Sequence, residues 1–409
     1  MLFQRSLLSA IESHLEDRRH TIVTGARQVG KTSILKLLHK KLKAHGEQVF
    51  QLTLEDSRVL QSINDHPDRI FEHLAAIPKP AQNGVADRRL FLLIDEVQYA
   101  ANPTHFLKFL YDKYEGNVKV VATGSSAFYI DRKFTDSLAG RKRVFQLYPL
   151  SLEEYLMFRG SGDLLEEYRS IQKQPSYISP DRAALKAVFY EYLTFGGYPA
   201  VALEPDTDEK ILLLNELKNA YVKRDIAESG VSMEAKFYLL FQLLADQTGN
   251  LVNKHELSKT IQVDTKTVDN YLYVLEKCYH LHLLKPFFRN FQKELTKMPK
   301  AFFNDLGLRN ALLNRFGPVD TRADKGALLE NFFFIKLRQQ YDPDQLRFWR
   351  TTEQQEIDFV VETSFGEGKA LEVKWDKRHF KPEKSSKFPA AYPGFTIGCL
   401  DEGDFIGLI

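Results

Sequence analysis

Apolar and polar positions along the first 150 residues predict short buried strands separated by amphipathic helices. Short runs at residues 20–24, 90–94 and 118–123, rich in β-branched or apolar residues, are typical of buried strands. Apolar residues at helical spacing occur over residues 3–20 and 32–44. Strands that alternate with helices predict an α/β fold with a parallel sheet covered on both faces.

Beyond residue 151 the pattern changes to longer helical segments. Amphipathic stretches predict helices at 236–247, 255–261 and 265–279, and a basic stretch that ends at Lys300 resembles a β-wing. A helix at 327–341 then precedes short strands at 347–350, 355–361 and 370–374. We predict four domains: 1–150, an α/β core; 151–230, a helical lid region; 231–297, a winged helix-turn-helix; and 298–409, a second α/β domain.

Composition narrows the class of protein without naming a function. The 409 residues are 44% hydrophobic and 27% charged, which excludes a disordered or collagen-like chain. No apolar run is long enough to span a membrane, and the amino terminus has no signal-peptide core. Two distant cysteines imply neither a disulfide framework nor a metal cluster, so we expect a reducing cytoplasm. The net charge of +2 leaves nucleic-acid binding undecided.

A glycine-rich loop follows the first predicted strand and fits the pattern G-x-x-x-x-G-K-[ST]. Its residues are Gly25, Ala26, Arg27, Gln28, Val29, Gly30, Lys31 and Thr32, with Ser33 next in the helix. In such loops backbone N–H groups surround phosphate oxygens, the lysine reaches the β- and γ-phosphates and the hydroxyl ligates Mg²⁺. A chance glycine turn is disfavoured because the loop lies between a strand and a helix. We therefore predict that the chain binds ATP or GTP with Mg²⁺.

Polar residues at the ends of the next two predicted strands complete this hypothesis. The strand at 90–94 ends in Asp95 and Glu96. We expect Asp95 to hold the Mg²⁺ shell and Glu96 to orient or deprotonate the attacking water. The strand at 118–123 precedes Ser125 and Ser126, which fit a residue that senses the γ-phosphate; a helix N-cap is the alternative.

These motifs resemble those of the AAA+ superfamily of P-loop ATPases. More narrowly, the chain is similar to a prokaryotic group in which such an ATPase precedes a domain of unknown function. The matching phrases are TGARQVGKT, FLLIDEVQYA, ATGSSAF, SLAGRKRVFQLYPLSLEEYL, FGGYP and YVKRDI. The resemblance covers nearly the whole chain and implies ATP hydrolysis and assembly into a homo-oligomer.

The resemblance suggests further residues near the nucleotide, each with an ordinary structural alternative. Arg141 is a candidate arginine finger supplied across a subunit interface, with Arg143 and Arg132 as rivals and a solvated basic turn as the alternative. Pro199, after Gly196-Gly197, resembles a glycine–proline motif near the base, although a plain turn explains it equally well. Arg224 is a candidate for contact with nucleotide or a neighbouring subunit.

The predicted helices at 255–261 and 265–279 have the spacing of a helix-turn-helix. The start of the second helix exposes Thr265, Lys266, Thr267 and Asn270, where such helices contact a major groove. Between residues 231 and 300, ten Lys/Arg face seven Asp/Glu, a small excess for a DNA-binding domain. Packing between subunits is the alternative use of this unit.

The last domain carries a nuclease-like pattern. Asp358 on one predicted strand, and Glu372 with Lys374 on the next, resemble the PD-(D/E)xK restriction-endonuclease fold, with Glu330 as the acid on the preceding helix. Asp358 and Glu372 would ligate a metal ion, and Lys374 would position water or stabilise charge. Half-exposed strand residues are the alternative. Basic residues with interleaved aromatics in the tail suit a phosphate backbone.

Our leading hypothesis is an oligomeric ATPase that acts on duplex or branched DNA. The alternative is a nucleotide-switched signalling or scaffold ATPase that acts on protein partners and carries an inactive nuclease-like domain. A protein-remodelling ATPase is a third, weaker hypothesis.

Overall fold

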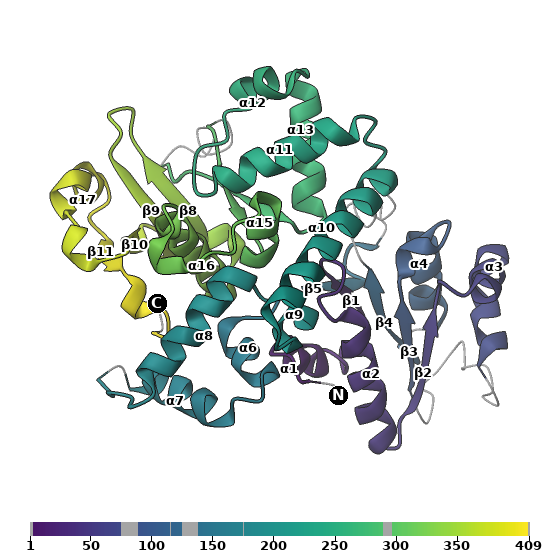
Figure 1. The fold of residues 1–409 in the computed structure, drawn as a ribbon. Coiled ribbons are helices and arrows are strands. Elements are labelled where there is room, and N and C mark those ends of the chain that lie inside the picture. Colours follow the sequence, from purple (N-terminus) through teal and green to yellow (C-terminus); the bar gives the residue numbers. More distant parts are fainter. Residues whose placement is uncertain are drawn as a thin grey trace. The chain divides into compact units, whose positions relative to one another are not determined.

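The computed structural model describes residues 3–74, 89–114, 116–124, 138–174, 176–288 and 297–407 (Figure 1). The chain divides into two compact units. The first is Met1–Tyr148 with Lys277–Tyr279, and the second is Pro149–Glu276 with His280–Ile409. The segments that the sequence divides into three later domains thus share one compact unit.

The first unit is built on a parallel sheet, which confirms the predicted α/β fold. Across the described ranges its strand order is β2-β3-β4-β1-β5. The strands are β1 (His20–Thr24), β2 (Gln48–Thr53), β3 (Leu90–Asp95), β4 (Val118–Gly124) and β5 (Lys142–Gln146). All residues of β1, β3 and β4 are buried, which agrees with their high content of β-branched and apolar residues.

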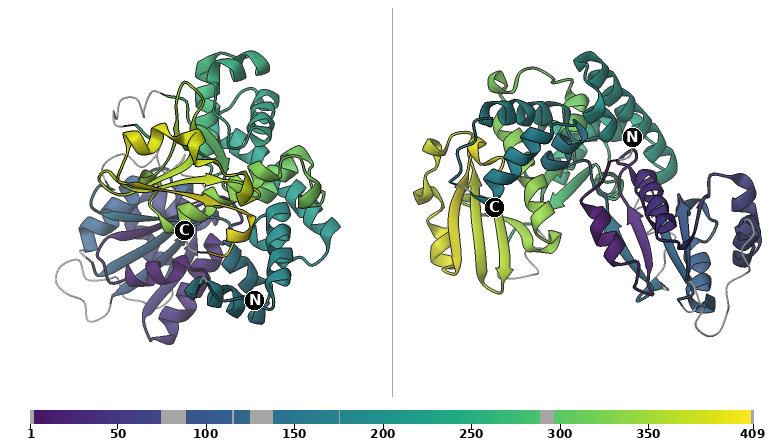
Figure 2. Two further views of the ribbon diagram at one scale, coloured as in Figure 1. Left: turned by 90° about the vertical axis from the view of Figure 1, so that its left-hand side faces the viewer. Right: turned by 90° about the horizontal axis from the view of Figure 1, so that it is seen from below.

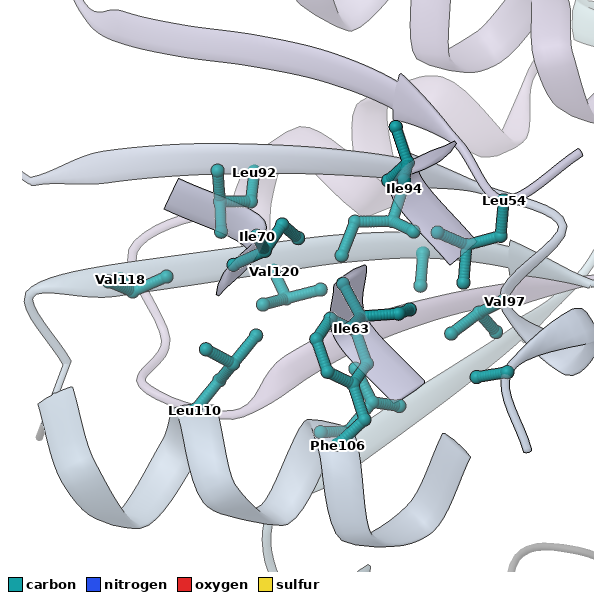
Figure 3. Packing of buried hydrophobic residues seen from close by; sticks show 14 of the residues in the cluster. Leu54, Ile63, Ile70, Leu92, Ile94, Val97, Phe106, Leu110, Val118 and Val120 are labelled. Atoms are coloured by element: carbon teal, nitrogen blue, oxygen red, sulfur yellow. The ribbon is translucent and has the colours of Figure 1, made fainter. Parts of the chain in front are cut away.

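Helices cover the faces of this sheet. They are α1 (Leu7–Ser13), α2 (Lys31–Ala44), α3 (Ser57–Asp65) and α4 (Pro103–Tyr114), with short 3₁₀ turns η1 (Pro67–His73) and η2 (Val97–Tyr99). Figure 3 shows Phe106 and Leu110 of α4 in one apolar cluster with Val120 of β4. The helix expected within residues 3–20 is shorter than its pattern, because a turn follows Ser13 and the chain then enters β1.

The second unit begins with a helical region and continues into a short hairpin. Its helices are α6 (Leu152–Phe158), α7 (Gly162–Lys173), α8 (Arg182–Phe195), α9 (Pro199–Leu203), α10 (Thr207–Ser229), α11 (Glu234–Asp246), α12 (Lys254–Ile261) and α13 (Thr265–Lys277). Strands β6 (Leu281–Leu284) and β7 (Lys300–Phe303) pair antiparallel, and Leu251 forms an isolated bridge to Lys300.

A mixed sheet forms the last part of the second unit, with strand order β11-β10-β9-β8 in the ranges that the structure describes. Figure 2 shows β9, β10 and β11 side by side. The elements are α15 (Leu306–Leu313), α16 (Lys325–Gln340), β8 (Leu346–Arg350), β9 (Glu356–Ser364), β10 (Glu367–Val373), α17 (Lys387–Ala391) and β11 (Phe395–Leu400), with 3₁₀ turns η4 (Val319–Thr321), η5 (Pro343–Gln345), η6 (Lys377–His379), η7 (Pro382–Ser385) and η8 (Glu402–Asp404). Within the described residues, no helix combines the length and apolar content needed to cross a membrane.

Candidate functional site

The glycine-rich loop follows the carboxyl end of β1, an interior strand of the first sheet. The register pairs Val23 with Thr123, so β1 and β4 end at the same edge. Gly25 has a φ of +156°, and a Cβ atom there would lie 2.1 Å from the carbonyl oxygen of Leu147. Only glycine allows this close approach of two backbones, so the first glycine of the motif has a packing reason as well as a chemical one.

Lys31 is held against the loop that it is expected to serve. Its side chain is buried, and its Nζ donates hydrogen bonds to the carbonyl oxygens of Gly25 (3.0 Å) and Ala26 (2.7 Å). Helix α2 starts at Lys31 itself, so the N–H groups of its first turn adjoin the loop. Ammonium and N–H groups thus converge at one point, which suits an anion.

Arg5 braces the loop from outside the motif. Its guanidinium donates to the carbonyl oxygens of Val29 and Tyr148, each at 2.7 Å, and its side chain is buried. Sequence analysis missed this residue because the contact joins segments 24 and 143 positions apart, and no local pattern marks it.

The predicted Mg²⁺ residues meet although they are distant in sequence. The Thr32 hydroxyl donates to Asp95 Oδ2 at 2.7 Å across 63 residues, and Asp95 is 7% exposed. The hydroxyl of Thr123 donates to the other oxygen, Oδ1. Hydroxyl and carboxylate oxygens are the ligands that Mg²⁺ prefers, so Thr32 and Asp95 fit the group that the motif implies.

Glu96 stands next to this pair in a constrained conformation. Its φ is +55°, in the left-handed region, and its N–H donates to Thr123 Oγ1 at 3.1 Å. Its carboxylate accepts a hydrogen bond from the Gln98 side chain and is partly exposed. Because the Glu96 carboxylate is partly exposed beside Thr32 and Asp95, it can contact a water molecule.

Thr123 is the polar residue at the end of β4 that the structure connects to both acids. Sequence analysis instead named Ser125 and Ser126, which lie outside the described residues, as does Arg132. The sequence does carry a signal for Thr123, since it is a hydroxyl residue that follows the apolar residues 120–122 near the end of the strand.

Arg141 lies at the end of the sheet where β1 begins, whereas the glycine-rich loop lies at the end where β1 stops. It precedes β5, whose first residue pairs with His20 at the start of β1. Its guanidinium forms an ion pair with Asp112 at 2.8 Å. The length of β1, roughly 13 Å, separates this end from the glycine-rich loop. Its rival Arg143 is exposed on β5 and lies over the Phe145 ring.

Gly196 and Gly197 pack closely against Asp305 inside the second unit. The N–H of Gly197 donates to Asp305 Oδ2 at 2.7 Å, and a Cβ on Gly196 would lie 2.4 Å from Asp305 Oδ1. Pro199 follows as the first residue of α9. These contacts support the plain-turn alternative for the motif. Arg224 is exposed on α10.

The four residues of the nuclease-like pattern gather in the second unit. Lys374 Nζ lies 3.1 Å from Glu372 Oε2 and 4.0 Å from Asp358 Oδ2. Asp358 Oδ2 also accepts the N–H of Val373 at 2.8 Å, and Ser385 donates to Glu372 Oε1 at 2.9 Å. Burial lowers the pKa of Lys374, but Asp358 and Glu372 outweigh it and hold that pKa above the ordinary value.

Glu330, from α16, joins this group through Lys300, which the sequence analysis treated only as the end of a basic stretch. Lys300 Nζ lies 3.0 Å from Glu330 Oε1, 2.6 Å from Glu356 Oε1 and 3.6 Å from Asp358 Oδ1. Burial opposes the charge on Lys300, but the carboxylates Glu330, Asp358 and Glu356 raise its pKa above the ordinary value. In the described part of the chain, no three His, Cys, Asp or Glu residues are arranged to hold a metal ion.

Three family models match successive parts of the chain. Residues 17–156 match a model described as "AAA domain", residues 186–318 match "Domain of unknown function (DUF8612)", and residues 325–396 match "Domain of unknown function (DUF4143)". The first match contains the glycine-rich loop, Asp95, Glu96 and Thr123, and the third contains the acids Glu330, Asp358 and Glu372.

Similar proteins include two that are named as uncharacterized. Protein MJ1544 of Methanocaldococcus jannaschii is 24% identical over 88% of this chain and 75% of its own length. A protein of Haemophilus influenzae is 26% identical over 83% of this chain and 78% of its own length. Among solved structures, Cdc6p from Pyrobaculum aerophilum aligns with 77% of this chain and 96% of its own, at 13% identity and a TM-score of 0.33. Residues 17–156 thus resemble an AAA domain in sequence, and the first unit carries the parallel sheet and the glycine-rich loop of a P-loop fold.

Proposed function

We propose that the first unit binds ATP with Mg²⁺ and hydrolyses it. The observation that carries this proposal is the hydrogen bond between Thr32 and Asp95, which joins the two predicted Mg²⁺ residues beside the loop that holds Lys31. A purely structural role for the loop would not need a buried ammonium, a hydroxyl and a carboxylate at the same edge of the sheet.

Each residue has a defined task in this proposal. When nucleotide binds, Lys31 exchanges its hydrogen bonds to Gly25 and Ala26 for phosphate oxygens. Thr32 and Asp95 would hold Mg²⁺, which neutralises charge on the transferred phosphoryl group. Glu96 accepts a proton from the attacking water or orients it, while Thr123 fixes the backbone of Glu96 and the carboxylate of Asp95.

Steady-state ATP turnover tests the proposal. We expect Lys31→Ala to lower kcat/KM by about 100-fold or more, because it removes a charged donor from a preorganised site. Glu96→Gln should lose turnover but retain bound ATP. Lys40→Ala, which removes an exposed lysine from a later turn of α2, is the matched control and should behave like the wild type. Undiminished turnover by Lys31→Ala protein would refute the site.

We propose that Arg141 acts in the site of a second copy of the chain. Arg141 and the glycine-rich loop of the same chain lie at opposite ends of β1. This separation supports action of Arg141 in a homo-oligomer. In the same turnover assay, Arg141→Ala should lose activity while ATP binding persists, and turnover per subunit should rise with protein concentration. Full activity in this variant at all concentrations would exclude the assignment.

We propose that the second unit contacts DNA through the start of α13. The order α11, Leu251, α12, α13, β6, β7 supports a winged helix-turn-helix, and Thr265, Lys266 and Asn270 are exposed. A cavity of about 480 Å³ beside them is lined in part by Lys254, His255, Thr265, Lys285 and Lys297. Basic and hydroxyl side chains around one depression suit phosphate groups. The effect of DNA on ATP turnover tests this role.

A further inference from the structure

We infer that the Lys300 ammonium takes the place of a metal ion in the carboxylate cluster of the second unit, so that this nuclease-like domain neither binds a divalent cation there nor cleaves DNA. This inference is independent of ATP hydrolysis in the first unit. It rests on the position of Lys300, on what its neighbours already bind and on how the chain fixes the residue.

The ammonium group stands among three acids, one of which, Asp358, is a metal ligand in the nuclease-like pattern. Glu330 from α16, and Glu356 and Asp358 from β9, each place one oxygen within 2.6 to 3.6 Å of Nζ. Lys300 itself is 2% exposed. Mg²⁺ needs oxygens at about 2.0–2.1 Å in octahedral geometry. The cluster is therefore spaced for an ammonium ion, and that ion fills the position.

Further oxygens of Glu356, Asp358 and Glu372 have protein partners too. Glu356 Oε2 accepts from Arg350 at 2.8 Å. The second oxygen of Asp358 is held by the N–H of Val373 and by Lys374, and the two oxygens of Glu372 are held by Ser385 and Lys374. A metal ion would have to displace several of these bonds as well as the Lys300 charge.

The chain fixes Lys300 in this position from the opposite side. Its strand β7 pairs with β6, with Lys300 opposite Leu284. Next to it, Ala301 accepts a hydrogen bond from the Gly249 N–H at 2.9 Å. The Phe348 ring lies 5.5 Å from Nζ on a further side. All residues of β7 are buried, so the strand cannot withdraw its lysine without disrupting the hairpin.

Thermal unfolding without nucleotide, in EDTA or in MnCl₂, tests the inference. Wild type should have the same Tm in both. Lys300→Met should have a lower Tm in EDTA, because three half-buried carboxylates lose their cation, and Mn²⁺ should raise that Tm by about 5 °C by binding the vacated position. Lys336→Met, which removes a buried lysine that donates to the Phe405 carbonyl at 2.7 Å, is the matched control and should not respond to Mn²⁺.

Two further measurements keep the inference falsifiable if Lys300→Met does not fold. The double variant Lys300→Met, Glu330→Gln removes one carboxylate with the ammonium and should show the same Mn²⁺ response; a folded double variant indifferent to Mn²⁺ would overturn the inference. When the wild type is titrated with Mn²⁺, we expect no ion bound through Asp358, that is, no binding that Asp358→Asn would abolish. Duplex DNA incubated with the wild type and Mn²⁺ should stay intact. A bound ion or DNA cleavage that Asp358→Asn removes would also overturn it.

Discussion

The hydroxyl of Thr123 connects the two acids of the nucleotide site. It donates to Asp95 and accepts the N–H of Glu96, so one side chain sets both the carboxylate that would hold Mg²⁺ and the backbone of the residue that would act on water. Glu96 has a positive φ, a conformation that a non-glycine residue keeps only when its surroundings fix it. Thr123 is therefore a positioning residue for both acids.

Replacement of Thr123 by valine should separate this role from packing. Thr123→Val keeps the shape but leaves the Glu96 N–H and one oxygen of Asp95 without this partner. Loss of a hydrogen bond to a charged group costs about 1.5–3 kcal/mol, so we expect kcat for ATP to fall by roughly 10- to 100-fold, with a smaller change in KM. Measurement of kcat and KM as a function of MgATP concentration checks this.

Thr123→Ser is the control because it retains the hydroxyl group. It should recover most of the turnover that valine loses. If serine and valine impair kcat equally, Thr123 acts through its methyl group and packing, and the positioning role is wrong.

Residues of the nucleotide site and of the carboxylate cluster differ in how far local sequence could reveal their roles. Lys31 and Thr32 could be predicted because the loop motif fixes their spacing, and Asp95 because it ends an apolar strand. Arg5 and Lys300 could not, because their partners are distant in sequence and each is set by tertiary packing. Local patterns predict chemistry well only where the backbone itself positions the group.

At the scale of elements, burial decides which strands the sequence reveals. Strands β1, β3 and β4 are buried on both faces and appear as runs rich in β-branched or apolar residues. The edge strands β2 and β5 keep several half-buried or exposed residues, so polar side chains interrupt the pattern and the sequence did not predict them. The parallel sheet was predictable, whereas its edges were not.

The turn between α8 and α9 is tied to the start of α15 through one buried acid. Asp305 caps α15 by accepting the Leu308 N–H at 2.8 Å, and its other oxygen accepts the N–H of Gly197. Burial raises the pKa of Asp305 to about 6, although backbone N–H groups of Gly197, Leu308 and Gly307 oppose this rise. The folded chain thus retains the proton of Asp305 up to a higher pH than the unfolded chain does.

This pKa shift predicts a pH-dependent part of the free energy of unfolding. Because the folded pKa is raised, the contribution is fully present below about pH 4, the unfolded pKa, and is lost as the pH rises through 6. A rise from 3.8 to about 6 corresponds to about 3 kcal/mol. Asp305→Asn should remove this dependence, so the stability difference between wild type and variant should shrink by that amount between pH 4 and pH 7.

Urea unfolding at several pH values measures the difference, and Asp324→Asn provides a control with the opposite shift. Although burial favours the neutral form of Asp324, hydrogen bonds from Arg322 and Arg309 hold its pKa below the ordinary value. Its contribution is therefore lost only below about pH 4, outside the tested window. A wild-type minus Asp305→Asn difference that stays constant with pH would contradict the assignment to Asp305.

At the scale of the whole molecule, the question is whether DNA on the second unit changes ATP turnover in the first. The exposed start of α13 carries Lys266, and the adjacent cavity is lined in part by Lys285 and Lys297. Contacts with phosphates release counterions, so their contribution to binding weakens as salt increases. If the second unit binds DNA and the two units are coupled, stimulation of ATP turnover should weaken in the same way.

We expect duplex or branched DNA to stimulate ATP turnover, with an effect that fades across a salt series. Lys266→Ala should weaken DNA binding for all sequences and reduce the salt slope by about one, because one phosphate contact is lost. Lys173→Ala, which removes an exposed lysine from α7, is the matched control and should leave the slope unchanged. If every DNA leaves turnover unchanged while Lys31→Ala abolishes it, the ATPase would stand and the DNA role would fall. The chain would then fit the nucleotide-switched alternative, in which protein partners respond to the bound nucleotide and the Lys300 cluster serves a domain that does not cut.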